Sequence, residues 1–304
     1  MPDKTLKTAL LSNALFSTLS GGTMLFFSSS VANLIGVGAT LLYQIIGVGL
    51  LGFAGYVAWV ATRDSINAYK ALEIILMDFL WVLGTMLLIP FIWPSLTGIG
   101  LLALIGVATI VGVFGFYQLK GIGQMYTVPG KPSTHRLCVA VDTLESADKI
   151  WSIIADLSTI KDYSPNLSQV ILRENAAPGV DSVRQCTDVK GKTWAEHCVR
   201  YDQEARILDM VFLADEPGFP YPFQTMQGGW EVAPNKNGST VHIWFEVTPK
   251  YRWAHSIILA LTTRDLARSF GDTVARMAAA ARGETVPIKA TPPQHGISYK
   301  LIPC

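Results

Sequence analysis

The sequence predicts two domains of different fold class, an α-helical four-span membrane domain followed by an α+β domain. The chain of 304 residues is 50% hydrophobic and 15% charged, with a mean hydropathy of +0.34, which is too apolar for a soluble protein of this size. The apolar excess lies before about residue 118. After about residue 135, strand-like alternation leads to one long amphipathic helix, which needs a sheet to pack against.

Composition along the chain predicts the domain boundaries. We expect a four-helix transmembrane domain over 1–124, a linker over 125–134, the α+β domain over 135–283 and a flexible tail over 284–304. The linker contains Gly, Pro and Ser with little periodicity. The tail has no core-forming pattern.

Four apolar segments approach the ~20 residues that cross a bilayer: Leu6–Phe27, Ala39–Ala61, Ala71–Ile89 and Ile99–Tyr117. Ser and Asn residues dilute the first segment, but it lacks a clear cleavage site, so we expect it to be retained. Lys and Arg precede the first span, occupy the second loop and follow the fourth span, whereas loops Ser28–Gly38 and Pro90–Gly98 have none. The positive-inside rule therefore predicts an inner-membrane protein with both termini in the cytoplasm.

Polar and small residues within the spans suggest contacts between helices. Glycines in the second and fourth spans permit close helix packing, which allows a homo-oligomer. Asp78 is an acid well inside the third span. We expect it to pair with Arg63 or to reach the cytoplasmic interface; the alternative is a polar contact or proton site inside the bundle. The spans contain no chain of acidic and basic residues of the kind that would indicate a pump or channel.

In the second domain, one strand and a short helix precede six further strands and the long helix. The short helix begins after Ser146, and the long helix covers Ser256–Arg282 with one apolar face. The predicted strands are Arg136–Asp142, Leu167–Glu174, Ser182–Val189, Thr193–Tyr201, Ile207–Leu213, Gln224–Val232 and Thr240–Thr248.

This order, with its residues, resembles the START/polyketide-cyclase (SRPBCC) helix-grip superfamily over about Arg136 to Arg282. The segments that carry the resemblance are Ala147–Trp151, Ile154–Asp156, Tyr163–Pro165, Pro178–Val183, Trp194–Glu196 and Gly238–Trp244. The resemblance implies a sheet that curls around the C-terminal helix and leaves a mostly apolar cavity. Such a fold binds lipids, sterols, quinones or polyketides, and only sometimes catalyses a reaction.

Strand alternation and the implied fold give a set of candidate ligand-binding residues. Loop Asp215–Phe223 is aromatic and stiff, which suits a lid over an apolar opening. The candidates are Tyr163, Trp194, Glu196, Met210, Phe212, Phe223, Trp230, Trp244, Phe270, Val274 and Met277.

Glu196 is the candidate catalytic residue. Alternation puts Trp194, Glu196 and Cys198 on one strand face, and relatives often carry a Glu at the matching position. A Glu in an apolar pocket can act as acid or base. The alternative is that Glu196 pairs with Arg184 or Arg200 on the outer face.

Other classes of site find no support. No Ser/His/Asp order, GxSxG, P-loop or metal triplet is present, so we expect no metal and no cofactor. The residues after Gln124 show no dense basic patch, which argues against nucleic acid. The four cysteines show no CxxC or Cys/His spacing and are expected to be reduced core thiols.

The preferred function is membrane-anchored binding, or transfer, of a hydrophobic small molecule or lipid in a helix-grip cavity. One alternative is a membrane-tethered enzyme of cyclase or dehydratase type that uses Glu196 as acid/base. Another is a membrane domain whose activity is regulated by the ligand-binding domain. A single carboxylate in a pocket is a weak catalytic signal, so binding is favoured over catalysis.

Overall fold

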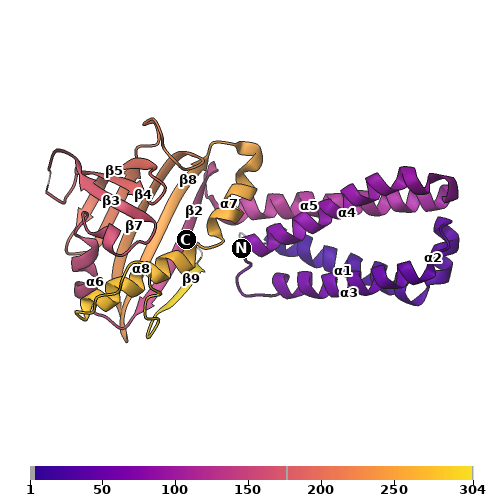
Figure 1. Ribbon diagram of the computed structural model, residues 1–304, viewed down its shortest axis with the longest axis horizontal. Helices are drawn as coiled ribbons and strands as arrows, with labels where there is room; N and C mark the ends of the chain where they lie inside the picture. Colours follow the sequence, from indigo (N-terminus) through magenta and orange to yellow (C-terminus); the bar gives the residue numbers. More distant parts are fainter. Residues whose placement is uncertain (1–3, 176, 303) are drawn as a thin grey trace. The chain divides into compact units, whose positions relative to one another are not determined.

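The computed structural model describes residues 4–175, 177–302 and 304, which form two compact units (Figure 1). The first, called here the helical unit, contains the chain up to Met125 together with Leu259–Leu261. The second, the sheet unit, contains Tyr126–Ile258 and Thr262–Cys304.

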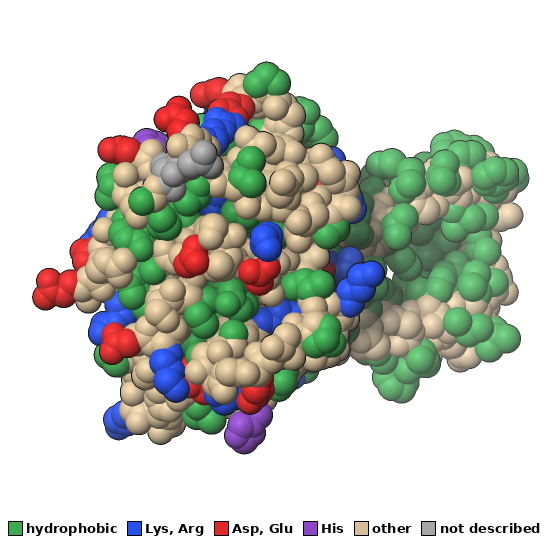
Figure 2. All heavy atoms as spheres, turned by 60° about the vertical axis from the view of Figure 1, so that its left-hand side comes forward, with side chains coloured by type: hydrophobic (Ala, Val, Ile, Leu, Met, Phe, Trp, Pro, Cys, Tyr) green, Lys and Arg blue, Asp and Glu red, His purple; other side chains and the backbone are tan. Residues whose placement is uncertain are grey.

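The helical unit contains the four predicted spans as long helices. They are α1 (Lys4–Phe26), α3 (Thr40–Ala61), α4 (Ala68–Ile92) and α5 (Gly98–Tyr126). Within the described residues these four helices are long and apolar enough to cross a membrane, which indicates a membrane protein. Figure 2 shows hydrophobic side chains over the visible face of this unit, while Lys, Arg, Asp and Glu are spread over the sheet unit.

A short helix, α2 (Ser28–Ile35), lies where a loop was expected. It ends at Gly36, whose φ of 96° is a left-handed conformation that favours glycine. The expected loop therefore contains about two turns of helix.

Glycine sets the distance between α1 and α3. A Cβ on Gly21 would lie 2.9 Å from the Gly47 carbonyl oxygen, and a Cβ on Gly47 would lie 2.7 Å from that of Gly21. Gly47 is therefore used inside the unit. Gly49, Gly52 and Gly55 face open space, so association of copies through these positions stays a prediction.

In the sheet unit, the described residues form one nine-stranded antiparallel sheet in the order β1-β2-β8-β7-β6-β5-β4-β3, with β9 paired to β2. The strands are β1 (Thr127–Val128), β2 (Lys131–Thr143), β3 (Leu167–Leu172), β4 (Val183–Asp188), β5 (Thr193–Asp202), β6 (Ile207–Phe212), β7 (Phe223–Asn235), β8 (Gly238–Pro249) and β9 (Ser298–Ile302). Three helices accompany them: α6 (Ala147–Ile154), α7 (His255–Thr263) and α8 (Leu266–Ala281).

The core lies between the inner face of the sheet and helices α6 and α8, and α8 crosses that face (Figure 1). Ile150 from α6, Val274 and Met277 from α8, and Val141 and Ile243 from the sheet are buried together. The apolar face of the last helix therefore packs as its periodicity predicts, and the helix-grip fold is confirmed.

The C-terminal helix is interrupted, although the sequence predicts one helix over Ser256–Arg282. α7 ends at Thr263 and α8 begins at Leu266. The Thr262 hydroxyl donates to the Ile258 carbonyl at 2.8 Å, a side-chain bond that competes with the helical backbone pattern. β-Branched Thr262 and Thr263, followed by Asp265, are weak helix formers at this point.

The predicted linker over 125–134 is also structured. α5 continues to Tyr126, β1 follows at once, and Gly130 with a φ of 78° turns the chain into β2. Backbone pairing between β1 and β2 orders a segment that has no apolar pattern of its own.

The tail, predicted to be flexible, packs on the sheet unit. Arg276 of α8, which is 5% exposed, donates to the carbonyls of Pro287 at 3.2 Å and Ala290 at 2.7 Å. Residues Ser298–Ile302 then pair with β2 as β9. Backbone hydrogen bonds and one buried arginine therefore replace the apolar pattern that the tail lacks.

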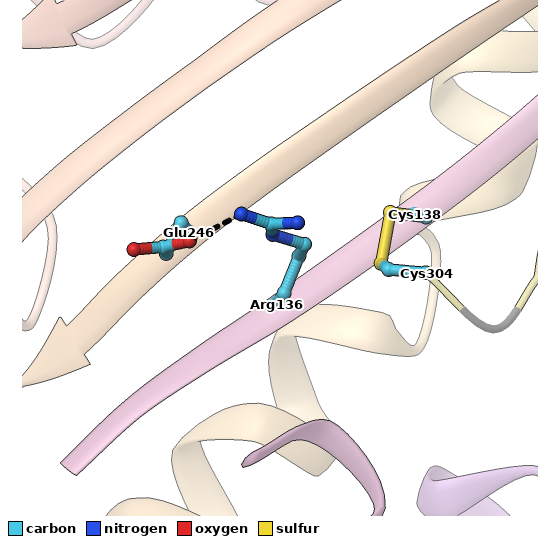
Figure 3. The surroundings of a disulfide bond; sticks show 4 residues. All are labelled: Arg136, Cys138, Glu246 and Cys304. Atoms are coloured by element: carbon cyan, nitrogen blue, oxygen red, sulfur yellow. Dashed lines mark hydrogen bonds and ion pairs between the residues drawn. A yellow bond between two sulfur atoms is a disulfide. The ribbon is translucent and has the colours of Figure 1, made fainter. Parts of the chain in front are cut away.

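The expectation of four reduced cysteines is wrong for two of them. Cys138 on β2 forms a disulfide with Cys304, across a sequence separation of 166 residues. Figure 3 shows this bond beside the ion pair of Arg136 and Glu246, which connects β2 to β8. Strand pairing of β9 brings the two cysteines together, a proximity that their sequence spacing does not reveal. Cys186 and Cys198 are free and buried.

Candidate functional site

A cavity of about 490 Å³ lies in the sheet unit between α8 and the inner face of the sheet. Its walls come from β4 to β8, the start of α8 and the loops before β3 and β7. Seven of the eleven predicted residues line it: Trp194, Glu196, Met210, Phe212, Phe223, Trp230 and Phe270.

Aromatic rings form the wall on the α8 side. Phe270 lies edge-on to Trp230 with ring centroids 5.4 Å apart, and 5.5 Å from the ring of Phe245 on β8. Such ring pairs favour one geometry beyond simple burial. This wall is therefore a shaped apolar surface.

The loop before β7 covers part of the cavity with Tyr221 and Phe219. The Tyr221 ring meets Trp194 edge-on at 5.4 Å, and Phe219 lies 5.5 Å from Tyr221. Arg173 donates two hydrogen bonds of 2.8 Å to the two carboxylate oxygens of Glu216 and so ties the loop to the segment after β3. The aromatic segment predicted as a lid thus has a fixed position beside the cavity.

A buried ion pair lies in the apolar wall. Arg184 on β4 and Glu196 on β5 are directly paired residues of neighbouring strands, 7% and 5% exposed. The Arg184 Nε donates to Glu196 Oε2 at 3.1 Å, and Nη2 donates to the same oxygen. Trp194 Nε1 donates to Glu196 Oε1 at 2.6 Å. Both carboxylate oxygens therefore already accept hydrogen bonds.

Burial in the cavity wall disfavours charge on a thiol and a phenol. Burial raises the pKa of the Cys186 thiol, and the nearby Glu196 carboxylate raises it further. Burial likewise raises the pKa of Tyr221. For Arg184, burial acts to lower the pKa, but attraction to Glu196 and hydrogen bonding to it outweigh this, so the pKa is raised. Next to the buried ion pair, the thiol and the phenol are therefore neutral, and the other charged lining residues are Asp188 and Lys190.

Four predicted residues do not line the cavity. Val274 and Met277 lie in the core beside α6, because they are further along α8 than Phe270 and Thr273, which line the wall. Tyr163 packs against the same core. Trp244 lies on a different face of β8, under the Arg136 guanidinium at 5.5 Å. Its neighbour Phe245, with the opposite strand orientation, lines the cavity instead.

Sequence reasoning missed Arg184 and Tyr221 as cavity residues. Alternation along β4 places Arg184 and Cys186 on one face, and pairing with β5 puts Arg184 opposite Glu196. The sequence had named Arg184 only as an outer-face partner. Glu196 and Trp194 share one strand face. Once the register between β4 and β5 is known, Arg184 must lie on that same face, and this could have identified it as a cavity residue.

No group of three or more His, Cys, Asp or Glu side chains within residues 4–175, 177–302 and 304 could hold a metal ion. Apart from the charged side chains of Arg184, Asp188, Lys190 and Glu196, the polar side chains of the cavity lining carry mainly hydroxyl and amide groups. The lining includes Ser164, Asn166, Tyr221, Thr262, Ser269 and Thr273.

Comparison with known proteins agrees with the resemblance seen in the sequence. Residues 141–282 match the model of a family described as polyketide cyclase / dehydrase and lipid transport. The match supports hydrophobic ligand binding or a cyclase-type role for the sheet unit. No curated protein matches the chain.

Several solved structures have a similar fold. Norcoclaurine synthase from Thalictrum flavum is 18% identical, with a TM-score of 0.40 over 49% of this chain and 96% of that chain. The Zhui aromatase/cyclase from a Streptomyces species is 14% identical, with a TM-score of 0.41 over 49% of this chain and 94% of that one. Ara h 8.0201 is 13% identical, with a TM-score of 0.41 over 50% and 99%.

Proposed function

We propose that the sheet unit binds a hydrophobic small molecule or lipid, and that the helical unit anchors this activity to a membrane. The observation that carries the proposal is the cavity of about 490 Å³, whose walls are mostly apolar and aromatic. Cavities of ~300–1,000 Å³ with apolar walls and a few polar groups are typical of small-molecule sites. The family match to residues 141–282 supports the same class of ligand.

The polar groups of the cavity favour a neutral ligand. Arg184 and Glu196 compensate each other's charge, and the other charged lining residues, Asp188 and Lys190, carry opposite charges, so the cavity wall has no net charge. Hydroxyl groups of Tyr221, Ser269 and Thr273 remain in the lining to meet hydroxyls or carbonyls of the ligand. A largely apolar molecule with one or a few oxygen functions fits this arrangement.

Binding explains the site better than acid–base catalysis by Glu196. A general acid or base needs hydrogen-bond access to the proton that it transfers. Both oxygens of Glu196 are taken by Arg184 and Trp194, and the pair is directly bonded across two strands. We assign Glu196 to shaping and polarising the cavity wall through Arg184.

We further propose that the sheet unit lies on the cytoplasmic side of an inner membrane. Lys and Arg flank the first span, the second loop and the end of the fourth span, all on one side. Cytosolic reductants keep most protein thiols reduced. On this side of the membrane, the Cys138–Cys304 bond is expected to be open in growing cells and to close on oxidation.

Ligand retention tests the proposal. Full-length protein purified in mild detergent is analysed by mass spectrometry for co-purifying apolar molecules. Phe270→Trp places a larger ring in the cavity wall. Met277→Trp also adds a larger ring, but in the core and outside the cavity lining. We expect Phe270→Trp to reduce the retained ligand and Met277→Trp to lower only stability, by ~1–3 kcal/mol. Equal retention in both variants would refute the proposed site.

A further inference from the structure

The helical unit contains a second cavity, of about 630 Å³. Side chains of α1, α2, α3, α4 and α5 line it, and almost all of them are apolar. The exceptions include the hydroxyls of Ser17, Ser20 and Thr85, the indole of Trp81 and the carboxylate of Asp78. An apolar chamber with its polar groups restricted to a few positions has the character of an amphiphile site.

Asp78 is held in place by two amide groups. Its side chain is 3% exposed, and Oδ2 accepts hydrogen bonds from Asn13 Nδ2 at 2.8 Å and Gln118 Nε2 at 3.2 Å. Ser17 donates to the Asn13 Oδ1 at 3.2 Å, which fixes the orientation of that amide. Three helices, α1, α4 and α5, thus orient one carboxylate oxygen.

Both hydrogen bonds to Asp78 end on Oδ2, and no described residue donates one to Oδ1. No Lys or Arg within the described residues forms an ion pair with Asp78 either. The predicted partner Arg63 lies instead over the Trp59 ring at 4.4 Å, so the expected pairing is wrong. A buried carboxylate with one oxygen unpaired is costly unless a group donates to that oxygen or the carboxyl binds a proton there itself.

We propose that this cavity binds an amphiphile whose head group donates a hydrogen bond to Asp78 Oδ1. The apolar body of the amphiphile occupies the part of the cavity between α3 and α5, lined by residues such as Phe53 and Val107. The donor is a hydroxyl or a primary ammonium group, since both carry the hydrogen that Oδ1 lacks. This site is separate from the proposed function of the sheet unit and does not depend on it.

Three probes with the same twelve-carbon chain and different head groups test which group donates the hydrogen bond. They are 1-dodecanol, dodecylamine and dodecyltrimethylammonium, which carries a positive charge without an N–H group. Binding of each to the full-length protein is measured by native mass spectrometry from detergent micelles. We expect the alcohol or the primary amine to bind and the trimethylammonium probe to bind at least about tenfold more weakly.

Asp78→Asn tests the head-group contact. The amide oxygen can keep the bonds from Asn13 and Gln118, while its NH₂ group replaces the acceptor Oδ1 with a donor. We expect affinity for dodecylamine to fall about tenfold or more, because its ammonium group has no acceptor for that NH₂ group. Glu73→Gln is the matched control, because it makes the same chemical change on α4 at a residue that accepts from Tyr56 and does not line the cavity.

Gly49→Phe tests the apolar part. Gly49 lines the cavity and Gly52 does not, yet a Cβ at either position meets nothing within 4 Å. We expect Gly49→Phe to abolish binding and Gly52→Phe to preserve it. Equal binding in these two variants, equal affinity of Asp78→Asn and the native protein, or equal binding of all three probes would each overturn the proposal.

Discussion

Arg184 and Glu196 depend on each other because both are buried and each is the other's ion-pair partner. Their side chains are 8% and 6% exposed, and the guanidinium has only the Leu157 carbonyl, at 3.4 Å, as a further acceptor. A buried charge whose partner is removed is strongly destabilising, whereas replacing both partners by apolar groups often costs little. Removing one partner is therefore expected to cost more stability than the intact ion pair contributes.

We expect Glu196→Leu and Arg184→Met each to destabilise the protein by about 3–5 kcal/mol, since each leaves one buried charge unpaired. The double variant Arg184→Met/Glu196→Leu should be more stable than either single variant. Thermal unfolding of the full-length protein in mild detergent provides the measurement. Additive losses in the double variant would show that the two residues act independently.

The lowered pKa of Glu246 predicts that the stability of the protein depends on pH. Burial acts to raise the pKa of its carboxyl, but hydrogen bonds from Arg136 and Lys131 and their charges outweigh this and lower it below its usual 4.5. The folded state then binds the proton more weakly than the unfolded state. The stabilisation is present above the unfolded pKa and is lost as pH falls through the folded pKa.

The melting temperature of the native protein should accordingly exceed that of Glu246→Gln at pH 7, and the two should converge as the pH is lowered from about 5 to about 3. Glu231→Gln on β7 is a control, because Glu231 has no ion pair among those of the described residues. A constant difference between native protein and Glu246→Gln across this pH range would contradict the assignment.

At the level of elements, the packing of β9 on α8 depends on a glycine. A Cβ on Gly271 would lie 2.2 Å from Cδ1 of Tyr299, so the helix leaves room for the ring of the strand. Glycine inside a helix costs ~1 kcal/mol relative to alanine. The ring contact is the reason for a glycine at a position where helix propensity favours alanine.

Gly271→Ala should therefore destabilise the native protein, because the ring or the helix must move. In a Tyr299→Ala background the clash is absent, and the same change should be neutral or stabilising by up to ~1 kcal/mol. Melting temperatures of the four proteins in this cycle give the sign of each effect. The same sign in both backgrounds would show that Tyr299 does not explain the glycine.

The elements that the sequence predicted well are those whose pattern is local. Alternation gave the strands from Arg136 to Thr248, and apolar length gave the four spans, because both patterns reflect the burial of individual residues. Interactions between distant segments escaped prediction. The order of the tail rests on Arg276, on pairing with β2 and on Cys138, none of which is apparent from residues 284–304.

The same distinction holds for the cavity. Trp194, Glu196 and Met210 were found from strand faces, and Phe270 from the helix face. Trp244 was assigned to the wrong face of its strand. Val274 and Met277 of α8 were predicted to line the cavity, but they lie in the core. Strand register and the position of the helix along the sheet determine these outcomes, and neither follows from periodicity alone.

For the whole molecule, the two cavities differ in how they treat charge. In the sheet unit, Arg184 compensates Glu196, and the other charged lining residues, Asp188 and Lys190, carry opposite charges. In the helical unit, Asp78 has amide donors on one oxygen and no cation. The first arrangement selects neutral apolar ligands, whereas the second selects a head group that donates a hydrogen bond. One chain can thus recognise two chemically different apolar molecules.

The side of the membrane on which the sheet unit lies can be tested with the cysteines of the chain itself. Cys186 and Cys198 are buried, and burial raises the pKa of Cys198 to about 11, so its thiol is protonated and unreactive at neutral pH. In a Cys138→Ser/Cys304→Ser background, which lacks the exposed thiol of Cys304, a membrane-impermeant maleimide should therefore label the protein weakly. Val180→Cys in the sheet unit and Ser95→Cys in the third loop each add an exposed thiol.

With the sheet unit in the cytoplasm, intact cells should label Ser95→Cys and leave Val180→Cys unlabelled until they are permeabilised. Acid trapping of thiols in cells with the native protein should find Cys138 and Cys304 reduced, and an added oxidant should join them. The reverse labelling, together with a disulfide present before oxidation, would place the sheet unit in an oxidising compartment. The bond would then stabilise the fold permanently, and Cys304→Ser would lower its stability by ~2–5 kcal/mol.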